Sequence, residues 1–331
     1  MLNNKTILIT GGTGSFGNQL VRNLLKNHKP KKIIIFSRDE LKQFDMYNKF
    51  REHENLRFFL GDVRDLDRLK QATSNVDIIF HAAALKQVSS SEYNPFECIK
   101  TNIHGAQNVI QASIENEVKY IVALSTDKAG NPINLYGATK LVSDKLFTAA
   151  NNISGINTLF SVVRYGNVAG SRGSVIPYFR ELIKNNSNTL PVTHEEMTRF
   201  WINLNQGVDF VIKSLNRMLG GEIFIPIIPS FKITDLASAM APDKKILYTG
   251  IRPGEKIHEI LCPRDDAHLT YKFSDHYVIS PSIRFFSRPN DFSKNKLNEE
   301  GVLVEKNFEY SSSSNEKFFT IPEIQRALKD I

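Results

Sequence analysis

The sequence contains very few cysteines, and the two that occur are far apart. Cys98 and Cys262 are the only ones among 331 residues, and they lack the spacing of a metal site or of a disulfide framework. This scarcity excludes a disulfide-stapled scaffold and predicts no metal centre. It is typical of a protein from a reducing compartment, so we expect a cytoplasmic location.

Long apolar runs are also absent. The longest ones, such as residues 33–36, are far shorter than the ~20 residues that a membrane-spanning helix needs. The chain begins Met-Leu-Asn-Asn-Lys and then enters a strand-like segment, so we expect no signal peptide. The sequence therefore predicts a protein without a membrane partner.

The excess of positive over negative charge is small. Lys and Arg number 42 and Asp and Glu number 35, which leaves a net charge of +7 at pH 7. A basic protein suggests nucleic-acid binding, but an anionic small molecule explains an excess of this size equally well. No basic run is interleaved with aromatic residues, so we expect no nucleic-acid partner. A hydrophobic content of 41% supports a sizeable core and excludes a disordered, collagen-like or coiled-coil chain.

What the sequence does contain is a regular alternation of strand-like and helix-like segments in its first half. Residues 15–27 carry apolar side chains at the spacing of an amphipathic helix. Apolar runs separated by such helices predict buried parallel strands joined by crossovers. The predicted strands span residues 5–10, 33–37, 56–60, 77–81 and 120–124.

The fold class that this alternation predicts is α/β. We expect a Rossmann-type, doubly wound parallel sheet with a smaller mixed α/β C-terminal substrate lobe. We assign residues 1–165 to the dinucleotide-binding domain, residues 166–285 to the substrate lobe and residues 286–331 to a polar, loop-rich tail. Residues 160–165 and 221–226 are candidates for further strands of the same sheet.

A glycine-rich turn lies where the first predicted strand meets the first predicted helix. Gly11, Gly14 and Gly17 form a G-x-x-G-x-x-G pattern. Glycines permit φ > 0 and let the backbone approach a pyrophosphate, which the helix N-terminus then holds. A glycine motif alone also fits an ordinary tight turn. The strand before it and the amphipathic helix after it favour dinucleotide binding.

The end of the second predicted strand bears on the choice of dinucleotide. An acid at this position would bind the ribose 2′-hydroxyl of NAD. Here Ser37 and Arg38 end the strand and Lys42 lies close, and a hydroxyl with cations suits a 2′-phosphate. We therefore predict NADP, with NAD kept open as the alternative by Asp39.

Two further strand ends lead to the same crevice. Asp62 follows the third predicted strand and is placed to accept a hydrogen bond from the adenine amino group. The small residues in His-Ala-Ala-Ala-Leu-Lys, residues 81–86, would let the backbone pass close to the dinucleotide. Lys86 then points at the crevice where the reactive end of the substrate should lie.

The fifth predicted strand leads to reactive side chains. Tyr136 and Lys140 form a Y-x-x-x-K pair whose members share one helix face. A nearby ammonium and the nicotinamide charge would together lower the pKa of Tyr136, so that the phenolate takes a proton from a sugar hydroxyl, and Thr126 hydrogen-bonds the same oxygen. The adjacent Asp127 and Lys128 indicate proton transfer beyond oxidation, for which the pKa of Lys128 must fall. The alternative for this dipeptide is a strand-end ion pair.

Together these motifs resemble the extended short-chain dehydrogenase/reductase superfamily. Within it the chain is similar to the inverting UDP-N-acetylglucosamine 4,6-dehydratases, which open the pseudaminic acid pathway. The resemblance extends from the N-terminus to about residue 260, and STDKAxNPINLYGATK is its most specific unit. The segments that carry it include ILITGGTGSFG, GDVRDLDRL, HAAALKQV, LSTDKAGNPINLYGATKL, VVRYGNVAGSRGSVIP, MTRFWI and GIRPGEKIHE.

The resemblance implies an NADP-dependent hydro-lyase. In the family reaction C4 is oxidised, a base removes the C5 proton, water leaves from C6, hydride returns to C6, and C5 is reprotonated from the opposite face. The product is UDP-2-acetamido-2,6-dideoxy-β-L-arabino-hex-4-ulose, destined for flagellin or capsule glycosylation. Resemblance assigns Tyr136 and Lys140 to the hydride half, and Lys128 as the C5 base with Asp127 as its proton-sharing partner. It also implies a homo-oligomer.

The resemblance further implies how UDP-N-acetylglucosamine is bound. Asn167 matches the asparagine near the diphosphate, Arg199 and Arg252 match cations for the UDP group, and Glu255 matches a carboxylate on the uridine ribose. Each arginine by itself would be interpreted as a surface salt bridge. The predicted substrate-binding residues are Lys86, Asn167, Arg199, Arg252 and Glu255. The predicted dinucleotide-binding residues are Gly11, Thr13, Gly14, Ser15, Phe16, Gly17, Ser37, Arg38, Asp39, Lys42, Asp62, Val63, Ala82, Ala83, Lys86, Thr101, Tyr136, Lys140 and Val168.

Other activities of the superfamily are the alternatives. They are a UDP-N-acetylglucosamine 5-epimerase or retaining 4,6-dehydratase, a 4-epimerase in which Asp127 and Lys128 are idle, and an NADP-sensing protein without turnover. Tyr136 argues against the first, because such relatives often carry methionine there. The intact Thr126, Tyr136 and Lys140 argue against the last. Gly130 departs from the family pattern, in which a small branched residue or alanine is usual at this position.

Overall fold

The computed structural model describes residues 1–154, 157–171, 173–283 and 291–331. Its main feature is a ten-stranded sheet in the order β15-β13-β14-β9-β6-β5-β4-β1-β2-β3. The strands from β9 to β3 in this order are parallel, whereas β14, β13 and β15 are antiparallel. The bounds are β1 Thr6–Thr10, β2 Lys32–Ser37, β3 Leu56–Leu60, β4 Ile78–His81, β5 Tyr120–Thr126, β6 Leu159–Tyr165, β9 Ile223–Pro226, β13 Thr270–Lys272, β14 His276–Ile279 and β15 Val302–Leu303.

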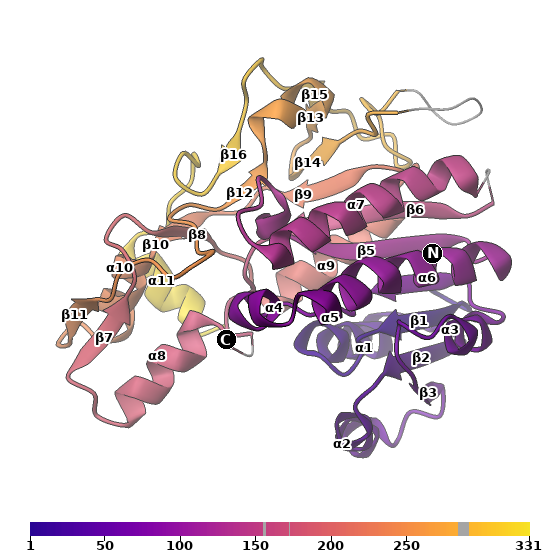
Figure 1. Cartoon of the computed structure of the whole chain (residues 1–331), viewed down its shortest axis with the longest axis horizontal. Helices are drawn as coiled ribbons and strands as arrows, with labels where there is room; N and C mark the ends of the chain where they lie inside the picture. The colour runs from indigo at the N-terminus through magenta and orange to yellow at the C-terminus, as the bar shows by residue number, and fades with distance from the viewer. Residues whose placement is uncertain (155–156, 172, 284–290) are drawn as a thin grey trace.

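Helices cover both faces of the sheet because the parallel strands are connected by crossovers (Figure 1). Buried side chains of α3, α6 and α7 pack on one face, and those of α1, α2 and α9 pack on the other. The predicted doubly wound parallel sheet is therefore confirmed, and 160–165 and 221–226 both contribute strands to it. The helices are α1 Ser15–Asn27, α2 Glu40–Phe50, α3 Leu66–Thr73, α4 Val88–Tyr93, α5 Pro95–Ile99, α6 Gly105–Glu115, α7 Leu135–Ile153 and α9 Leu204–Arg217, with a π-helix at Lys100–His104 and 3₁₀ turns η2 at Asp127–Ala129 and η3 at Arg264–Leu269.

A smaller lobe extends from one end of the sheet, on the left of Figure 1. It has its own buried apolar cluster, in which Phe179, Trp201 and Leu236 take part. The lobe mixes helices with short strand pairs, as predicted. Its elements are α8 Val175–Lys184, β7 Thr189–Val192, β8 Thr198–Phe200, β10 Ser230–Lys232, α10 Ile233–Met240, β11 Lys245–Tyr248 and α11 Ile321–Leu328.

The C-terminal residues return to several parts of the molecule. From 291 onward, β15 extends the main sheet, β16 (Tyr310–Ser311) pairs with β12 (Ile260–Cys262), and α11 packs in the lobe with Ile324 fully buried. The predicted division at 165, 285 and 331 stays a prediction, and the boundary between 285 and 286 lies outside the described residues, as does residue 172 of a segment that carries the family resemblance.

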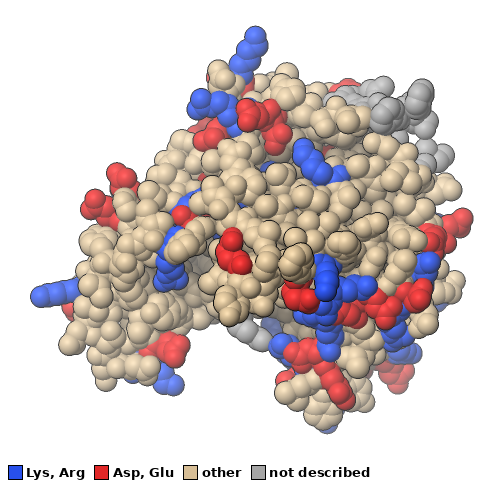
Figure 2. Space-filling model, viewed as in Figure 1, with Lys and Arg blue, Asp and Glu red and all other residues tan. Residues whose placement is uncertain are grey.

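Charged side chains are mixed on the face of the molecule seen in Figure 2, where Lys and Arg alternate with Asp and Glu. Among the residues that the structure describes, every helix is too short or too polar to cross a bilayer.

Candidate active site

A cavity of about 580 Å³ lies at the carboxyl ends of the parallel strands. Loops after β1, β2, β3, β4, β5 and β6 all reach it, because the carboxyl ends of parallel strands meet at one edge of a sheet. Every residue predicted to bind the dinucleotide, from Gly11 to Val168, lines this cavity. The sequence prediction therefore selected residues that the fold brings together, although their contacts with a dinucleotide stay a prediction.

The turn between β1 and α1 has the shape that a pyrophosphate needs. Gly11 has φ = +63°, and a Cβ there would lie 2.9 Å from the backbone of Ala82 and Ala83. A Cβ on Gly17 would lie 2.2 Å from the Gly12 carbonyl oxygen. Among the described residues, no side chain caps the N-terminus of α1, whose N-cap residue is Gly14, so its first N–H groups are available for an anion. The backbone thus fits a dinucleotide diphosphate.

The side chains at the end of β2 are held by neighbours. The hydroxyls of Thr13 and Ser37 are 2.8 Å apart, and Asp39 caps α2 by accepting a hydrogen bond from the Lys42 N–H. The guanidinium of Arg38 is half exposed and lies 3.4 Å from Asp62. A hydroxyl, a guanidinium and an ammonium therefore line this end of the cavity, as a 2′-phosphate would require.

Asp62 is more strongly engaged than the sequence indicated. Besides Arg38, its carboxylate accepts hydrogen bonds from the Arg64 guanidinium at 2.7 and 3.0 Å. Burial would raise the pKa of Asp62, but the hydrogen bonds and charge of Arg64 outweigh it, so the pKa is lowered. The carboxylate is thus ionised and paired with two arginines, and its predicted contact with adenine stays a prediction.

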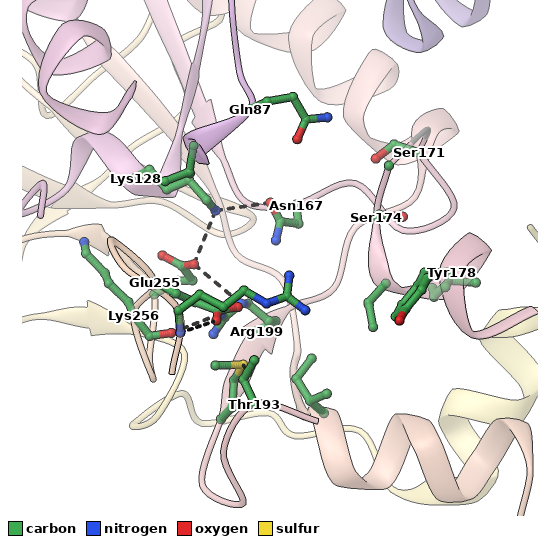
Figure 3. Close-up of a pocket in the computed structure, with 18 of the residues that line it drawn as sticks. Gln87, Lys128, Asn167, Ser171, Ser174, Tyr178, Thr193, Arg199, Glu255 and Lys256 are labelled. Atoms are coloured by element: carbon green, nitrogen blue, oxygen red, sulfur yellow. Dashed lines mark hydrogen bonds and ion pairs between the residues drawn. The ribbon is translucent and has the colours of Figure 1, made fainter. Parts of the chain in front are cut away.

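A second cavity, of about 820 Å³, opens toward the smaller lobe. All five predicted substrate-binding residues line it, and Lys86 and Asn167 line the first cavity as well. The two cavities therefore meet at these residues. In Figure 3, Lys128 points into the second cavity, with Gln87 and Tyr178 on other parts of its wall.

Lys128 is the centre of a charged cluster at this junction. Its Nζ lies 3.0 Å from Asp127 Oδ1, 3.2 Å from Asn167 Oδ1 and 3.3 Å from Glu259 Oε1. The side chains of Asp127 and Glu259 are 0% and 2% exposed, and that of Lys128 is 16% exposed. Thr126 donates a further hydrogen bond to Asp127 Oδ1 at 2.9 Å. Sequence reasoning had brought Thr126, Asp127 and Lys128 together, but it had not identified Glu259.

The electrostatics of this cluster correct one prediction. Burial would lower the pKa of Lys128, but the charges of Asp127 and Glu259 outweigh it, so the pKa is raised rather than lowered. The pKa of Asp127 is raised, first by burial and then by the charge of Glu259. The pKa of Glu259 is lowered, because Lys128 and Arg199 overcome the effect of burial. Environments that push the pKa values of two carboxyl groups apart give them different roles in proton transfer.

Tyr136 and Lys140 lie in the first turns of α7, which begins where Asn134 caps the helix through the Gly137 N–H at 2.7 Å. Burial raises the pKa of Tyr136 to about 12, although the charge of Lys128 and a hydrogen bond with Thr126 oppose it. Burial lowers the pKa of Lys140. The lowering predicted for a tyrosine beside a bound nicotinamide stays a prediction, because in the protein alone the pKa is raised; the cation that acts on Tyr136 is Lys128.

Comparison with known proteins identifies the family. A family model described as a polysaccharide biosynthesis protein matches residues 7–281. An inverting UDP-N-acetylglucosamine 4,6-dehydratase of Campylobacter jejuni is 61% identical over 316 residues, which cover 95% of this chain and 94% of the relative. The chain belongs to the family of inverting UDP-N-acetylglucosamine 4,6-dehydratases. The resemblance inferred from the motifs is thereby confirmed.

Proteins that are less similar to this chain include some that are named as other enzymes. A UDP-glucose 4-epimerase of Rickettsia canadensis is 42% identical over 287 residues, with 84% of each chain covered. The X-ray structure of Pen from Bacillus thuringiensis superposes with a TM-score of 0.87 at 36% identity and covers 100% of this chain and 99% of its own. A dTDP-glucose 4,6-dehydratase of Streptomyces venezuelae, solved with NAD and TYD bound, has a TM-score of 0.68 at 22% identity and covers 76% of this chain and 86% of its own. The last likeness shows the fold alone.

Arg199 and Arg252, two of the predicted substrate residues, differ in their contacts with the rest of the protein. The Arg199 guanidinium donates to the carbonyls of Thr198, Ile257 and Lys256 at 2.7–2.9 Å, and it lies 3.8 Å from Glu255. Arg199 therefore holds the 255–259 segment in place while it lines the cavity. Arg252 is exposed at the cavity wall. For these residues, contact with a UDP group stays a prediction.

Glu259 is the main residue that the sequence analysis missed. It stands in the segment GIRPGEKIHE, next to the apolar residues of β12. An acid directly before a buried strand was the signal that could have marked it, since buried acids are uncommon without a partner. Which partner it would meet depends on the fold, because Lys128 is 131 positions away in the chain.

Proposed function

We propose that the protein dehydrates UDP-N-acetylglucosamine across C4 and C6 with inversion at C5, as an NADP-dependent hydro-lyase. The observation that carries the proposal is Lys128 at the junction of two cavities. Its Nζ contacts the carboxyl groups of both Asp127 and Glu259. It lies close to the point where the two cavities meet, since Lys86 and Asn167 line both of them. A proton-transfer group at the meeting point of a dinucleotide and a sugar is what a dehydratase requires beyond an oxidoreductase.

The residues that would hold NADP are those of the first cavity. Gly11 and Gly17 leave room for the diphosphate at the N-terminus of α1, and Ser37, Arg38 and Lys42 would hold the 2′-phosphate. When bound, the dinucleotide supplies the oxidant that accepts hydride from C4 and gives it back at C6. Tyr136 would receive the proton of the C4 hydroxyl. The pKa of Tyr136 is raised in the protein alone, and the positive charge of a dinucleotide bound beside it would lower this pKa.

The elimination half falls to Asp127 and Lys128. Because the pKa of Lys128 is raised, this lysine is a cation in the resting protein. The Lys128 ammonium first passes one of its protons to Asp127 Oδ1, 3.0 Å away, and the amine so formed takes the C5 proton as the C5–H bond breaks. Asp127 must begin as the carboxylate, and its raised pKa makes it a good acceptor. The pair then returns a proton to the C6 hydroxyl, which leaves as water.

The UDP group would occupy the second cavity. Lys86, Asn167 and Arg252 line it as donors for the diphosphate, and Arg252 offers the bidentate geometry that phosphate favours. Glu255 would accept from the uridine ribose. Arg199 would contribute its charge while holding the 255–259 segment through its backbone contacts.

A second candidate function is 4-epimerisation, which the name of the Rickettsia relative favours. In that reaction C4 is oxidised and reduced from the other face, and no group need remove the C5 proton. The buried cluster of Asp127, Lys128 and Glu259 would then have no chemical task. Its placement in the cavity supports dehydration over epimerisation.

The test is to incubate the protein with UDP-N-acetylglucosamine in D₂O, with NADP or NAD supplied separately, and to follow the products by proton NMR. A C6 methyl group, one deuterium at C5 and loss of the C4 proton are expected, with faster turnover on NADP. A C4 epimer without a methyl group would overturn dehydration, and a C5 epimer that keeps its C6 hydroxyl would indicate a 5-epimerase.

The same proposal covers the setting of the reaction. We place the enzyme in the cytoplasm, as a homo-oligomer, at the first step toward pseudaminic acid for flagellin or capsule glycosylation. Light scattering of the purified protein tests the oligomer, and coupling the product to a pyridoxal-dependent aminotransferase tests its place in the pathway.

A further inference from the structure

Glu259 is a buried acid on which two cations of the active site converge. Its Oε1 lies 3.3 Å from Lys128 Nζ and 3.5 Å from Arg199 Nε. Its Oε2 is buried without a hydrogen-bond partner among the described residues, and so is Oδ2 of Asp127. Each carboxyl group therefore contacts Lys128 through one oxygen, and its other oxygen has no hydrogen-bond partner among the described residues. Natural folds rarely leave such groups buried, and each one calls for an explanation beyond stability.

The fold brings Glu259 to Lys128 through three backbone contacts of residues 259–261. The Glu259 N–H donates to Ser312 Oγ at 2.9 Å, and the Ser312 N–H donates to the Glu259 carbonyl at 2.8 Å. The buried Arg164 donates to the Leu261 carbonyl at 3.0 Å. These contacts tie the segment both to the parallel sheet and to the C-terminal residues.

Gly130 makes the close approach possible. A Cβ at this position would lie 2.3 Å from the carbonyl oxygen of Ile260, so any other residue would push β12 away from the turn that carries Lys128. Lys256 Nζ also donates to the Gly130 carbonyl. The departure of Gly130 from the family pattern thus coincides with the point at which Glu259 is brought against the lysine.

We propose that Glu259 is a positioning residue for the dehydration. Its carboxylate would hold Lys128 Nζ, 3.3 Å away, and Arg199 Nε, 3.5 Å away, so that the lysine is fixed beside Asp127 for the transfer of the C5 proton. The inference rests on the proposed function and adds to it a residue outside the T-D-K segment.

The sign of the charge effect follows from the groups that face Glu259. These are Asp127 and Lys128 from η2, Arg199 from β8 and Lys256 from its own segment. The negative charge of Glu259 stabilises a proton on Asp127 and on Lys128 alike. Removing this charge should therefore move the acid limb of the pH–rate profile, which reports the protonation of Asp127, to lower pH.

The experiment compares E259Q with the wild-type protein, with E259D and with the matched control E222Q. Glu222 is also a buried glutamate, held by Ser161 Oγ at 2.8 Å and by the Gly220 N–H at 2.6 Å, and it lines neither cavity. Three quantities are measured with UDP-N-acetylglucosamine. They are the transient absorbance of reduced nicotinamide, which reports C4 oxidation, the rate of C6-methyl formation by NMR, and the pH profile of that rate.

We expect E259Q to keep C4 oxidation and to form the methyl product about 10- to 100-fold more slowly, less than the full contribution of a proton-transfer group. The acid limb of the pH profile should move to lower pH. E259D restores the charge and should bring this limb back, with part of the rate. E222Q should retain the wild-type profile.

Two results would overturn the proposal. One is an E259Q protein with the wild-type rate and the wild-type acid limb. The other is an equal loss of oxidation and dehydration with an unmoved acid limb, which indicates a structural role. A wild-type protein that forms no methyl product would instead contradict the proposed function, and the variants would then be compared for C4 oxidation alone, where equal rates in all of them reject a role for Glu259 in that step.

Discussion

The two cavities meet at Lys86 and Asn167, but they are constructed differently. The dinucleotide cavity is lined by loops that each begin where a parallel strand ends, and its shape depends on backbone that no side chain obstructs, as at Gly11. The substrate cavity is lined by segments distant in the chain, and its floor is a set of buried charges. We therefore expect the dinucleotide cavity to be impaired by substitutions that add side-chain volume, and the substrate cavity by substitutions that remove a charge.

Replacing Lys128 with alanine should abolish the chemistry of the substrate cavity, leave dinucleotide binding unchanged and give the largest effect. Without the ammonium the C5 proton has no acceptor in the cluster, so the C6-methyl product should form about 10²–10⁴-fold more slowly. NMR of the product measures the rate, and a dinucleotide titration should give the wild-type affinity. Lys145→Ala, at an exposed lysine of helix α7, is the control. Full turnover by Lys128→Ala would remove the lysine as the base.

Replacing Gly11 with alanine should impair the dinucleotide cavity. The left-handed φ of +63° costs an L-residue about 1–2 kcal/mol, and the new Cβ would meet the backbone of Ala82 and Ala83. Dinucleotide affinity, measured by calorimetry, should fall about tenfold or more. Gly250→Ala is the matched control, because Gly250 has φ = +82° with nothing within 4 Å. If the two variants lose the same affinity, the close approach is irrelevant.

Replacing Arg38 with alanine should sharpen the assignment of the first cavity. A guanidinium that contacts a 2′-phosphate is worth roughly tenfold in affinity at a half-exposed position. We expect the ratio of NADP to NAD affinity to fall about tenfold. Arg64→Ala is the control, since Arg64 also pairs with Asp62 but does not line the cavity. A ratio unchanged in Arg38→Ala would favour NAD as the dinucleotide.

Replacing Asn134 with alanine should give the smallest effect and fall on the substrate side. Asn134 caps α7 and also donates to the Gly254 carbonyl at 2.8 Å, which fixes the loop that carries Arg252 and Glu255. Loss of a cap costs about 1 kcal/mol, so the KM for the nucleotide sugar should rise about fivefold. Steady-state kinetics and thermal unfolding measure the two consequences. An equal loss of dinucleotide affinity would contradict the separation of the two sites.

The sequence predicted the first cavity in detail because its determinants are local. The helix predicted at 15–27 is α1, and strands such as 56–60 were placed to the residue. In a parallel sheet, residues that follow strand ends meet at one edge, so naming those residues was sufficient to name the lining of the cavity.

The electrostatics of the second cavity could not be predicted in this way. The sequence put Lys128 beside Asp127 and required the pKa of Lys128 to fall. The fold instead brings the carboxylate of Glu259 to the lysine, and its charge adds to that of Asp127 in raising this pKa. A long-range contact of this kind leaves no periodicity or spacing to detect.

The sequence by itself determined the parallel architecture, the glycine-rich turn after β1, the family and the choice of the T-D-K and Y-x-x-x-K residues as candidates, because each is recognised from neighbours within one turn or one strand. The tertiary structure alone decided that Lys128 is a cation between two buried acids and that the C-terminal Ser312 secures one of them. The physical reason is that burial and Coulomb interactions depend on distance in space, and chain separation says nothing about that distance until the sheet and the lobe have closed around the site.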